Sequence, residues 1–350
     1  MSAEEQPPLK RPRTSDDSEG PSGSTEQSGP ELVRSEELWF EDGSVIIQAE
    51  STQFRVHKTI LARSSSIFRD IFEIGEQSAS EAVVDGCPVV HVSDSAVEMH
   101  HFLLLLYDQK YAPGKLPTLT QIMAMLRLGR KYDVDFLYQE ALRRLQFEFP
   151  STLAAFNPGQ PVYKQFSWQP GALFDVVTLA QEMRIHSILP AALFYCAALP
   201  LKALFSGLAR EDATIATIPA EVLQTLLIGL DALLGSLGHI SLKWIRGNAG
   251  SPLCDSPQSC KNWRVTLLEI VFKVKPDVRL CLADTRGFDA ILGFLCRSCR
   301  KHARSEHQIG RGEIWQSLPQ FFGLESWDRA LSPDPGPWPM DSHDLATCAE

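Results

Sequence analysis

The chain has 350 residues, of which 44% are hydrophobic, and a net charge of −10. This length allows two folded units. The negative charge disfavours non-specific nucleic-acid binding as the main activity, because most of the protein's surface would repel a polyanion. No run approaches the roughly 18 apolar residues of a membrane-spanning helix, and the N-terminus lacks the apolar region of a signal peptide. We therefore expect an intracellular protein, in the nucleus or the cytoplasm, with its eight cysteines reduced.

Residues 1–34 are rich in Ser, Pro, Glu and Gly and poor in large apolar side chains. Burial cannot offset the entropy lost on ordering such a segment, so the sequence predicts a disordered tail. Within the tail, Lys10, Arg11 and Arg13 form a short basic cluster. The cluster is compatible both with a nuclear import signal and with a chance grouping.

Residues 45–56 show the pattern of a β hairpin, with a β-branched run, a polar break and a second alternating run. From Lys58 the apolar residues recur at three- and four-residue steps, which predicts two short helices with N-cap candidates among Ser64, Ser65 and Ser66. Further along, residues 89–92 predict a third short strand. Three more helices are predicted over residues 102–107, 118–134 and 136–149.

These elements carry a specific motif. Phe54, His57, Lys58, Leu61, Ser65 and Phe68 resemble the pattern F-x-x-H-[KR]-x-x-L-x-x-x-S-x-x-F of BTB/POZ domains. With Trp39 and the Asp-Gly pair at residues 42–43, the segment is similar to the BTB proteins expanded in mushroom-forming fungi, the basidiomycetes. The resemblance implies an α+β fold over residues 38–150, with a short three-stranded sheet and a helical cluster.

The resemblance also implies a function. BTB/POZ domains bind proteins and form homodimers by pairing their first helix, and in the family an acidic and a basic residue line a charged pocket at that interface. Asp42 and Lys58 resemble those two positions. His57, the one residue here that could look like a catalytic base, is expected to have a structural role at the end of a strand.

After the first domain, residues 151–171 contain repeated Pro and Gly, which predicts a linker. Residues 172–331 return to helical periodicity, and we expect an all-α C-terminal domain there. Its aromatic segment around Trp315 and Trp327 is expected to fold back onto the domain. Residues 332–350 are again rich in Pro and Gly and predict a second disordered tail.

The C-terminal domain contains a cysteine-rich segment at residues 254–302. Cys254 and Cys260 lie in a polar stretch, and Cys296 and Cys299 are predicted to end an apolar helix on one face with His302. Four such ligands suit a closed, structural zinc site, with His302 as an alternative fourth ligand. Unligated thiols are the other interpretation, and Cys196 and Cys281 are expected to be core residues.

No motif of an enzyme is present: there is no G-x-S-x-G, no H-E-x-x-H and no phosphate-binding loop. The sequence therefore predicts a non-enzymatic interaction protein that self-associates through its BTB domain. One alternative is a substrate adaptor for a cullin-type ubiquitin ligase, with Met99 as the exposed contact. The other is a nuclear DNA-associated regulator of transcription, with a basic contact formed by Arg297, Arg300, Lys301 and Arg304.

Overall fold

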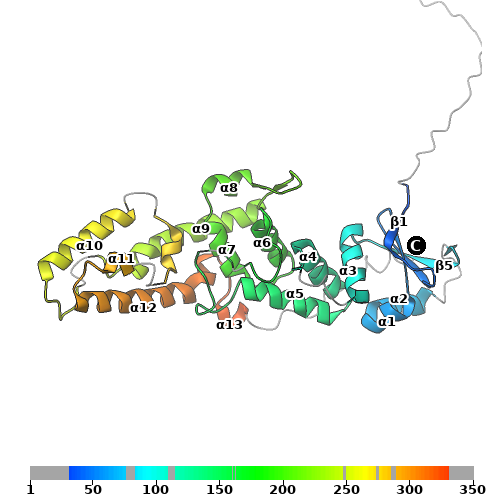
Figure 1. Cartoon of the computed structure of the whole chain (residues 1–350), viewed down its shortest axis with the longest axis horizontal. Coiled ribbons are helices and arrows are strands. Elements are labelled where there is room, and N and C mark those ends of the chain that lie inside the picture. The colour runs from blue at the N-terminus through cyan, green and yellow to red at the C-terminus, as the bar shows by residue number, and fades with distance from the viewer. Residues whose placement is uncertain are drawn as a thin grey trace, which may run out of the picture.

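The computed structural model describes residues 31–75, 83–108, 115–159, 161, 163–246, 250–272, 276–284 and 289–330. The predicted import signal at Lys10, Arg11 and Arg13 lies outside the described residues, as does the C-terminal tail. The molecule is elongated, with a β-sheet at one end and a helical region extending from it to the other (Figure 1). The chain is therefore α+β at its N-terminal end and mostly helical beyond it, as the sequence predicted.

Five strands form the sheet, in the order β1-β3-β2-β5-β4. Their bounds are β1 Val33–Trp39, β2 Val45–Ala49, β3 Thr52–Val56, β4 Val83–Val84 and β5 Cys87–Val92. Strands β2 and β3 form the predicted antiparallel hairpin, and β5 lies parallel to β2. The sequence analysis missed the two edge strands, and β1 begins inside the segment that was expected to be a disordered tail.

Five helices complete the first domain: α1 Lys58–Ser64, α2 Ser66–Gly75, α3 Ala96–Asp108, α4 Leu119–Lys131 and α5 Asp135–Glu148. Ser65 joins the first pair to the rest of the domain. Its hydroxyl accepts a hydrogen bond from Phe68 N at 3.0 Å and donates one to the carbonyl of Tyr132 at 2.5 Å. This buried serine fixes the turn between α1 and α2 against the end of α4.

The predicted linker is packed against the first domain. Phe156 and Phe166 are buried, with exposed fractions of 5% and 1%. The buried carboxylate of Glu148, at the end of α5, accepts hydrogen bonds from three consecutive linker amides, those of Tyr163, Lys164 and Gln165. The chain between the two predicted domains is thus held by burial and by backbone hydrogen bonds.

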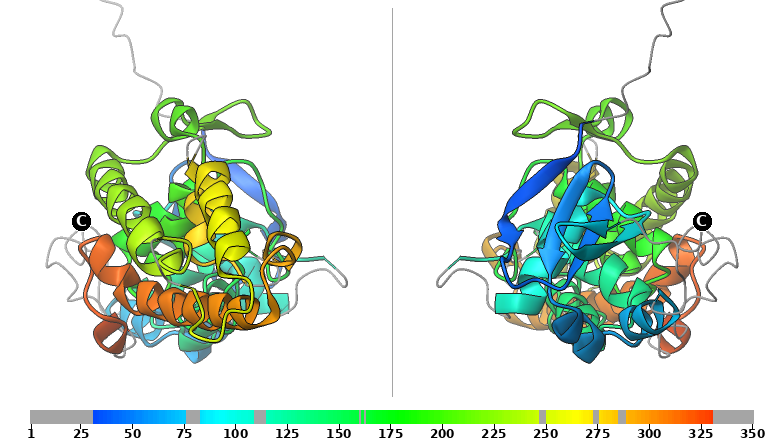
Figure 2. Two further views of the ribbon diagram at one scale, coloured as in Figure 1. Left: turned by 90° about the vertical axis from the view of Figure 1, so that its left-hand side faces the viewer. Right: turned by 90° about the vertical axis from the view of Figure 1, so that its right-hand side faces the viewer.

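The helical region consists of α6 Ala172–Glu182, α7 Leu189–Ala197, α8 Leu201–Ser206, α9 Ala220–Ser236, the π-helix η1 Leu237–Ser241, α10 Pro257–Phe272, the 3-10 helix η2 Val278–Cys281, α11 Asp289–Leu292, α12 Arg297–Phe321 and α13 Trp327–Ala330. A two-stranded hairpin, β6 Leu208–Ala209 with β7 Ile215–Ala216, is its only β structure among the described residues. Every residue of α7 is buried, so this helix is the centre of the region. Figure 2 views the molecule from its two ends: α10 and α12 face the viewer in the left view, and the sheet faces the viewer in the right view.

One helical stretch among the described residues, Ala220–Ser241, is long and apolar enough to cross a membrane by length and composition alone. The sequence analysis did not identify it, because Glu221 and Asp231 interrupt its apolar run. In the structure the stretch packs against α7 and α12. Core helices of soluble proteins pass the same test, so this stretch is weak evidence for a membrane segment.

Candidate functional site

The first candidate surface surrounds His57, which follows β3 and caps α1. The backbone N–H of His57 donates to the hydroxyl of Tyr107 at 2.7 Å, and its Nδ1 lies 2.8 Å from the same oxygen. Phe40 stacks on the Tyr107 ring at 4.8 Å between centroids, and burial raises the pKa of Tyr107. His57 is thus held through both its backbone and its ring, which agrees with the structural role expected from the sequence.

Asp42 and Lys58 lie on opposite sides of this histidine along the chain. The Asp42 carboxylate is 3.2 Å from His57 Nε2, and its side chain is 86% exposed. The backbone N–H of Lys58 donates to Ser44 Oγ at 3.0 Å, and its ammonium lies 5.6 Å from the centre of the Phe72 ring. Lys58 also borders a shallow depression lined by Ile71, Phe72, Gly75, Pro88 and Val90. The surface therefore combines an acidic group, a basic group and apolar side chains.

The second candidate site is a cluster of four cysteines. The sulfur atoms of Cys254, Cys260, Cys296 and Cys299 all lie within 4.8 Å of one another. Among the described residues this is the only group of cysteine, histidine and acidic side chains close enough to share a metal ion, and His302 is outside it. The structure thus brings together the four cysteines that the sequence analysis named as ligands.

The sequence analysis was wrong about the local structure of this cluster. It placed Cys296 and Cys299 at the end of an apolar helix, but α11 ends at Leu292, and Cys296 is the N-cap of the long helix α12. Cys254 does lie in a loop, while Cys260 is in the first turn of α10. Each pair therefore places one cysteine just before a helix and the other in its first turn.

The electrostatic surroundings of three of the sulfur atoms, those of Cys260, Cys296 and Cys299, differ. Burial raises the pKa of Cys260 and raises that of Cys299 to about 12. The backbone N–H of Cys299 lowers the pKa of the Cys296 thiol by stabilising its thiolate. The cysteines expected to be core residues are buried elsewhere: Cys196 lies within α7, and Cys281 donates its S–H to the carbonyl of Leu233.

Two other predicted contacts differ from expectation. Met99, named as an exposed contact for a cullin, is fully buried in α3, where it belongs to the hydrophobic core. Part of the basic group on α12 has structural partners. Arg300 donates to the carbonyls of Gly293 and Leu295, and Arg304 pairs with Asp289 at 2.6 Å.

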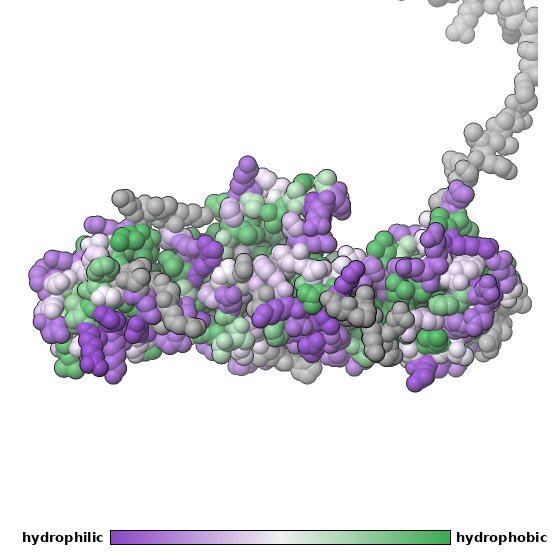
Figure 3. All heavy atoms as spheres, viewed as in Figure 1, coloured by the Kyte–Doolittle hydropathy of each residue, from purple (hydrophilic) through white to green (hydrophobic). Residues whose placement is uncertain are grey.

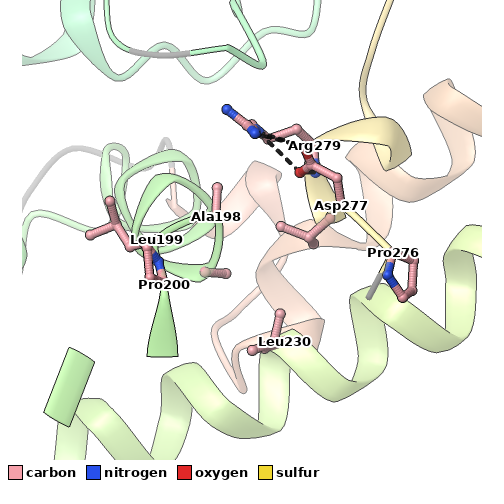
Figure 4. A pocket seen from close by; sticks show the side chains of 9 residues that line it. Ala198, Leu199, Pro200, Leu230, Pro276, Asp277 and Arg279 are labelled. Atoms are coloured by element: carbon pink, nitrogen blue, oxygen red, sulfur yellow. Dashed lines mark hydrogen bonds and ion pairs between the residues drawn. The ribbon is translucent and has the colours of Figure 1, made fainter. Parts of the chain in front are cut away.

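The helical region also has a pocket of about 260 Å³ beside α9 (Figure 4). Its charged lining groups are Asp277 and Arg279, whose carboxylate and guanidinium pair at 2.7 Å. Because these charges neutralise each other, the lining provides no activated acid or base. Figure 3 shows hydrophobic surface over α8 and α9. The exposed apolar side chains of this part of the chain are Leu201, Phe205, Ile215 and Ile228.

Comparison with protein families finds that residues 40–147 match the BTB/POZ domain. The chain therefore contains a BTB/POZ domain, which is a module for protein–protein interaction and not a catalytic one. A comparison with curated proteins finds no match to this chain. The match includes the whole surface around His57 and ends before the helical region and its four cysteines.

Proposed function

We propose that this protein is a non-enzymatic interaction protein that self-associates through its BTB/POZ domain, and that it is of the type expanded in mushroom-forming fungi. The observation that carries the proposal is the mixed surface at Asp42 and Lys58, which lies within the matched domain. The Lys58 side chain beside a small apolar depression and the Asp42 carboxylate against the neighbouring His57 provide opposite charges that suit a self-complementary contact. They would favour the correct partner and orientation more than raw affinity.

The loop that presents Asp42 supports the proposed surface. Gly43 follows Asp42 in a tight turn, where a Cβ atom would lie 2.8 Å from Arg55 Cγ and 2.9 Å from the carbonyl oxygen of Phe40. The turn before β2 therefore favours a glycine after Asp42. Through its contact with His57, Asp42 is held at the surface in a defined position.

The test is sedimentation velocity over a micromolar concentration series with charge-reversal variants. In a two-fold contact each Asp42 would face the Lys58 of the other subunit, so D42K or K58D should weaken the dimer on the order of tenfold or more. The double variant D42K/K58D should restore association. The control is K202E, which reverses the charge of an exposed lysine on α8. A wild-type protein that stays monomeric, or single variants that dimerise like the control, would contradict the proposal.

The two alternatives have weaker support. A cullin adaptor would need a contact residue other than Met99, because Met99 is buried. A DNA-associated regulator would have to use a basic group in which Arg300 and Arg304 already hold the start of α12 in place. The first role therefore lacks its named contact, and for the second the remaining members of the named basic group, Arg297 and Lys301, are exposed.

A further inference from the structure

We propose that Cys254, Cys260, Cys296 and Cys299 bind one structural zinc ion that joins the starts of α10 and α12. A zinc ion with Zn–S distances of about 2.3 Å in a regular tetrahedron places its sulfur ligands about 3.8 Å apart. The sulfur atoms of Cys254 and Cys296 are 3.8 Å apart, and all four lie within 4.8 Å of one another. The spacing is that of ligands around a shared ion, and four protein ligands leave no position for a reactive water.

Backbone amides support the charge that such a site would carry. Four thiolates around Zn²⁺ form a dianionic centre, which needs nearby hydrogen-bond donors. Cys260 Sγ accepts a hydrogen bond from the N–H of Cys296 at 3.3 Å, and Cys296 Sγ accepts one from the N–H of Cys299 at 3.4 Å. The position of Cys296 as the N-cap of α12 also directs the positive end of that helix toward the site.

A buried arginine one helical turn after Cys260 gives an independent indication. Arg264 lies four residues after Cys260 on the same side of α10 and is 6% exposed. Among the described residues its Nε and Nη1 atoms have no hydrogen-bond partner. A buried cation is costly unless negative charge compensates it. A zinc tetrathiolate at this position would supply that charge.

The packing of α10 shows why a cross-link is needed here. Of its 16 residues, only Cys260, Arg264 and Leu267 are buried. Trp263 is partly exposed and contacts Phe294, which is itself largely exposed. Its other apolar contacts with the core, by Trp263, Leu268, Val271 and Phe272, are only partly buried, so a zinc ion would add a fixed cross-link to a weakly packed helix. The site lies where α10 and α12 begin, at the end of the molecule farthest from the sheet (Figure 1).

The test begins with the full-length wild-type chain, purified under reducing conditions and dialysed against a mild chelator. Elemental analysis should find one zinc per chain, and a thiol-blocking reagent should release it. Cobalt substitution should give the strong visible absorption of a tetrahedral thiolate site. These measurements need no variant, so they remain decisive even if a cysteine substitution prevents folding.

Variants identify the ligands. Each of C254S, C260S, C296S and C299S should lose the bound zinc or reduce its affinity by at least tenfold, whereas H302A and the buried control C281A should keep one zinc per chain. In the wild type, strong chelation should increase amide exchange in α10 and the start of α12 and leave the sheet unchanged. A folded, reduced chain that binds no added zinc would overturn the proposal, as would disulfides among these cysteines or zinc lost from H302A. None of these results depends on whether the BTB/POZ domain self-associates.

Discussion

At the scale of single residues, buried polar groups join elements that are distant in the sequence. His307 in α12 is 1% exposed, and its Nε2 lies 2.9 Å from the carbonyl oxygen of Ala283. Its Nδ1 lies 3.1 Å from the carbonyl oxygen of Ser241 in η1. One imidazole therefore links α12 to η1 and to the segment after η2. The sequence analysis gave this histidine no role, because the contacts that define it come from residues 24 and 66 positions away.

The same histidine predicts a pH dependence of stability. Burial lowers the pKa of His307 in the folded chain below the usual histidine value of 6.5, although the carbonyls of Ala283 and Ser241 oppose the shift. The unfolded chain then takes up the proton more readily, so this contribution to stability is complete above about pH 6.5 and is lost as the pH falls below it. We expect H307Q to show a flatter decline in the free energy of unfolding over that range.

Urea unfolding of wild type and H307Q at a series of pH values measures the difference. His101 in α3 also has a pKa lowered by burial and adds to the wild-type slope. The difference between the two proteins isolates His307, and H101Q is the matched control at the other end of the molecule. Parallel stability curves for wild type and H307Q would show that the buried ring is not linked to folding.

At the scale of elements, α9 and α12 approach closely at a glycine. A Cβ atom on Gly229 in α9 would lie 2.1 Å from Phe322 Cδ1, and Phe322 is buried at the end of α12. Gly235 lies in the same helix and has no atom within 4 Å of the corresponding position. Substituting alanine at each of these two glycines separates the effect of close packing on stability from the effect of helix propensity.

We expect G229A to lower the free energy of unfolding by about 1–3 kcal/mol, because the added methyl group displaces the Phe322 ring. G235A should leave it unchanged or raise it by up to ~1 kcal/mol, because alanine favours the helix and meets no neighbour. Chemical unfolding of both variants against wild type measures the contrast. A G229A protein as stable as G235A would mean that the two helices do not pack as tightly as described.

The elements themselves were predictable to different degrees. The β-branched run of β2, the alternation in β3 and the motif from Phe54 to Phe68 were enough for the hairpin and the first helical pair. Strand β1 was missed because it has no apolar alternation: four of its seven residues are exposed and three are charged, as expected of an edge strand. Its pairing with β3 depends on the folded structure. The start of α12 was also missed, because its polar sequence follows an apolar run that attracted the helix assignment.

The candidate sites show the same limit. The cysteines could be grouped from their residue type and polar context, but their mutual distances depend on how α10 and α12 are placed. Met99 was expected to be exposed because the periodicity of α3 is obscured by apolar residues on nearly every side. Sequence patterns therefore identified which residues have unusual chemistry better than which face of an element they occupy.

At the scale of the whole molecule, the hydrophobic core is continuous from the sheet to the helical region. One cluster of buried side chains includes Phe54 in β3, Phe166 in the predicted linker and Phe194 in α7. Polar contacts also join the first domain to the helical region. Arg127 of α4 pairs with Glu182 of α6, and Trp315 Nε1 donates to the carbonyl of Ser151. The proline and glycine residues that predicted a linker do break the helices, but they do not separate two independent cores.

This continuity predicts that the two parts unfold together and that Glu148 couples them. In E148Q an amide NH₂ would replace one of the oxygens that accept hydrogen bonds from Tyr163, Lys164 and Gln165. Because the site is buried and loses its charge, we expect the free energy of unfolding to fall by about 2–4 kcal/mol. The matched control is E140Q, where a partly exposed carboxylate pairs with Arg143 and Arg144 and the loss should stay below ~1 kcal/mol.

Hydrogen exchange should show that E148Q reduces protection in β2 and in α7 by similar amounts. If only one of these elements lost protection, the first domain and the helical region would unfold independently. Residues 151–171 would then connect two separate folding units.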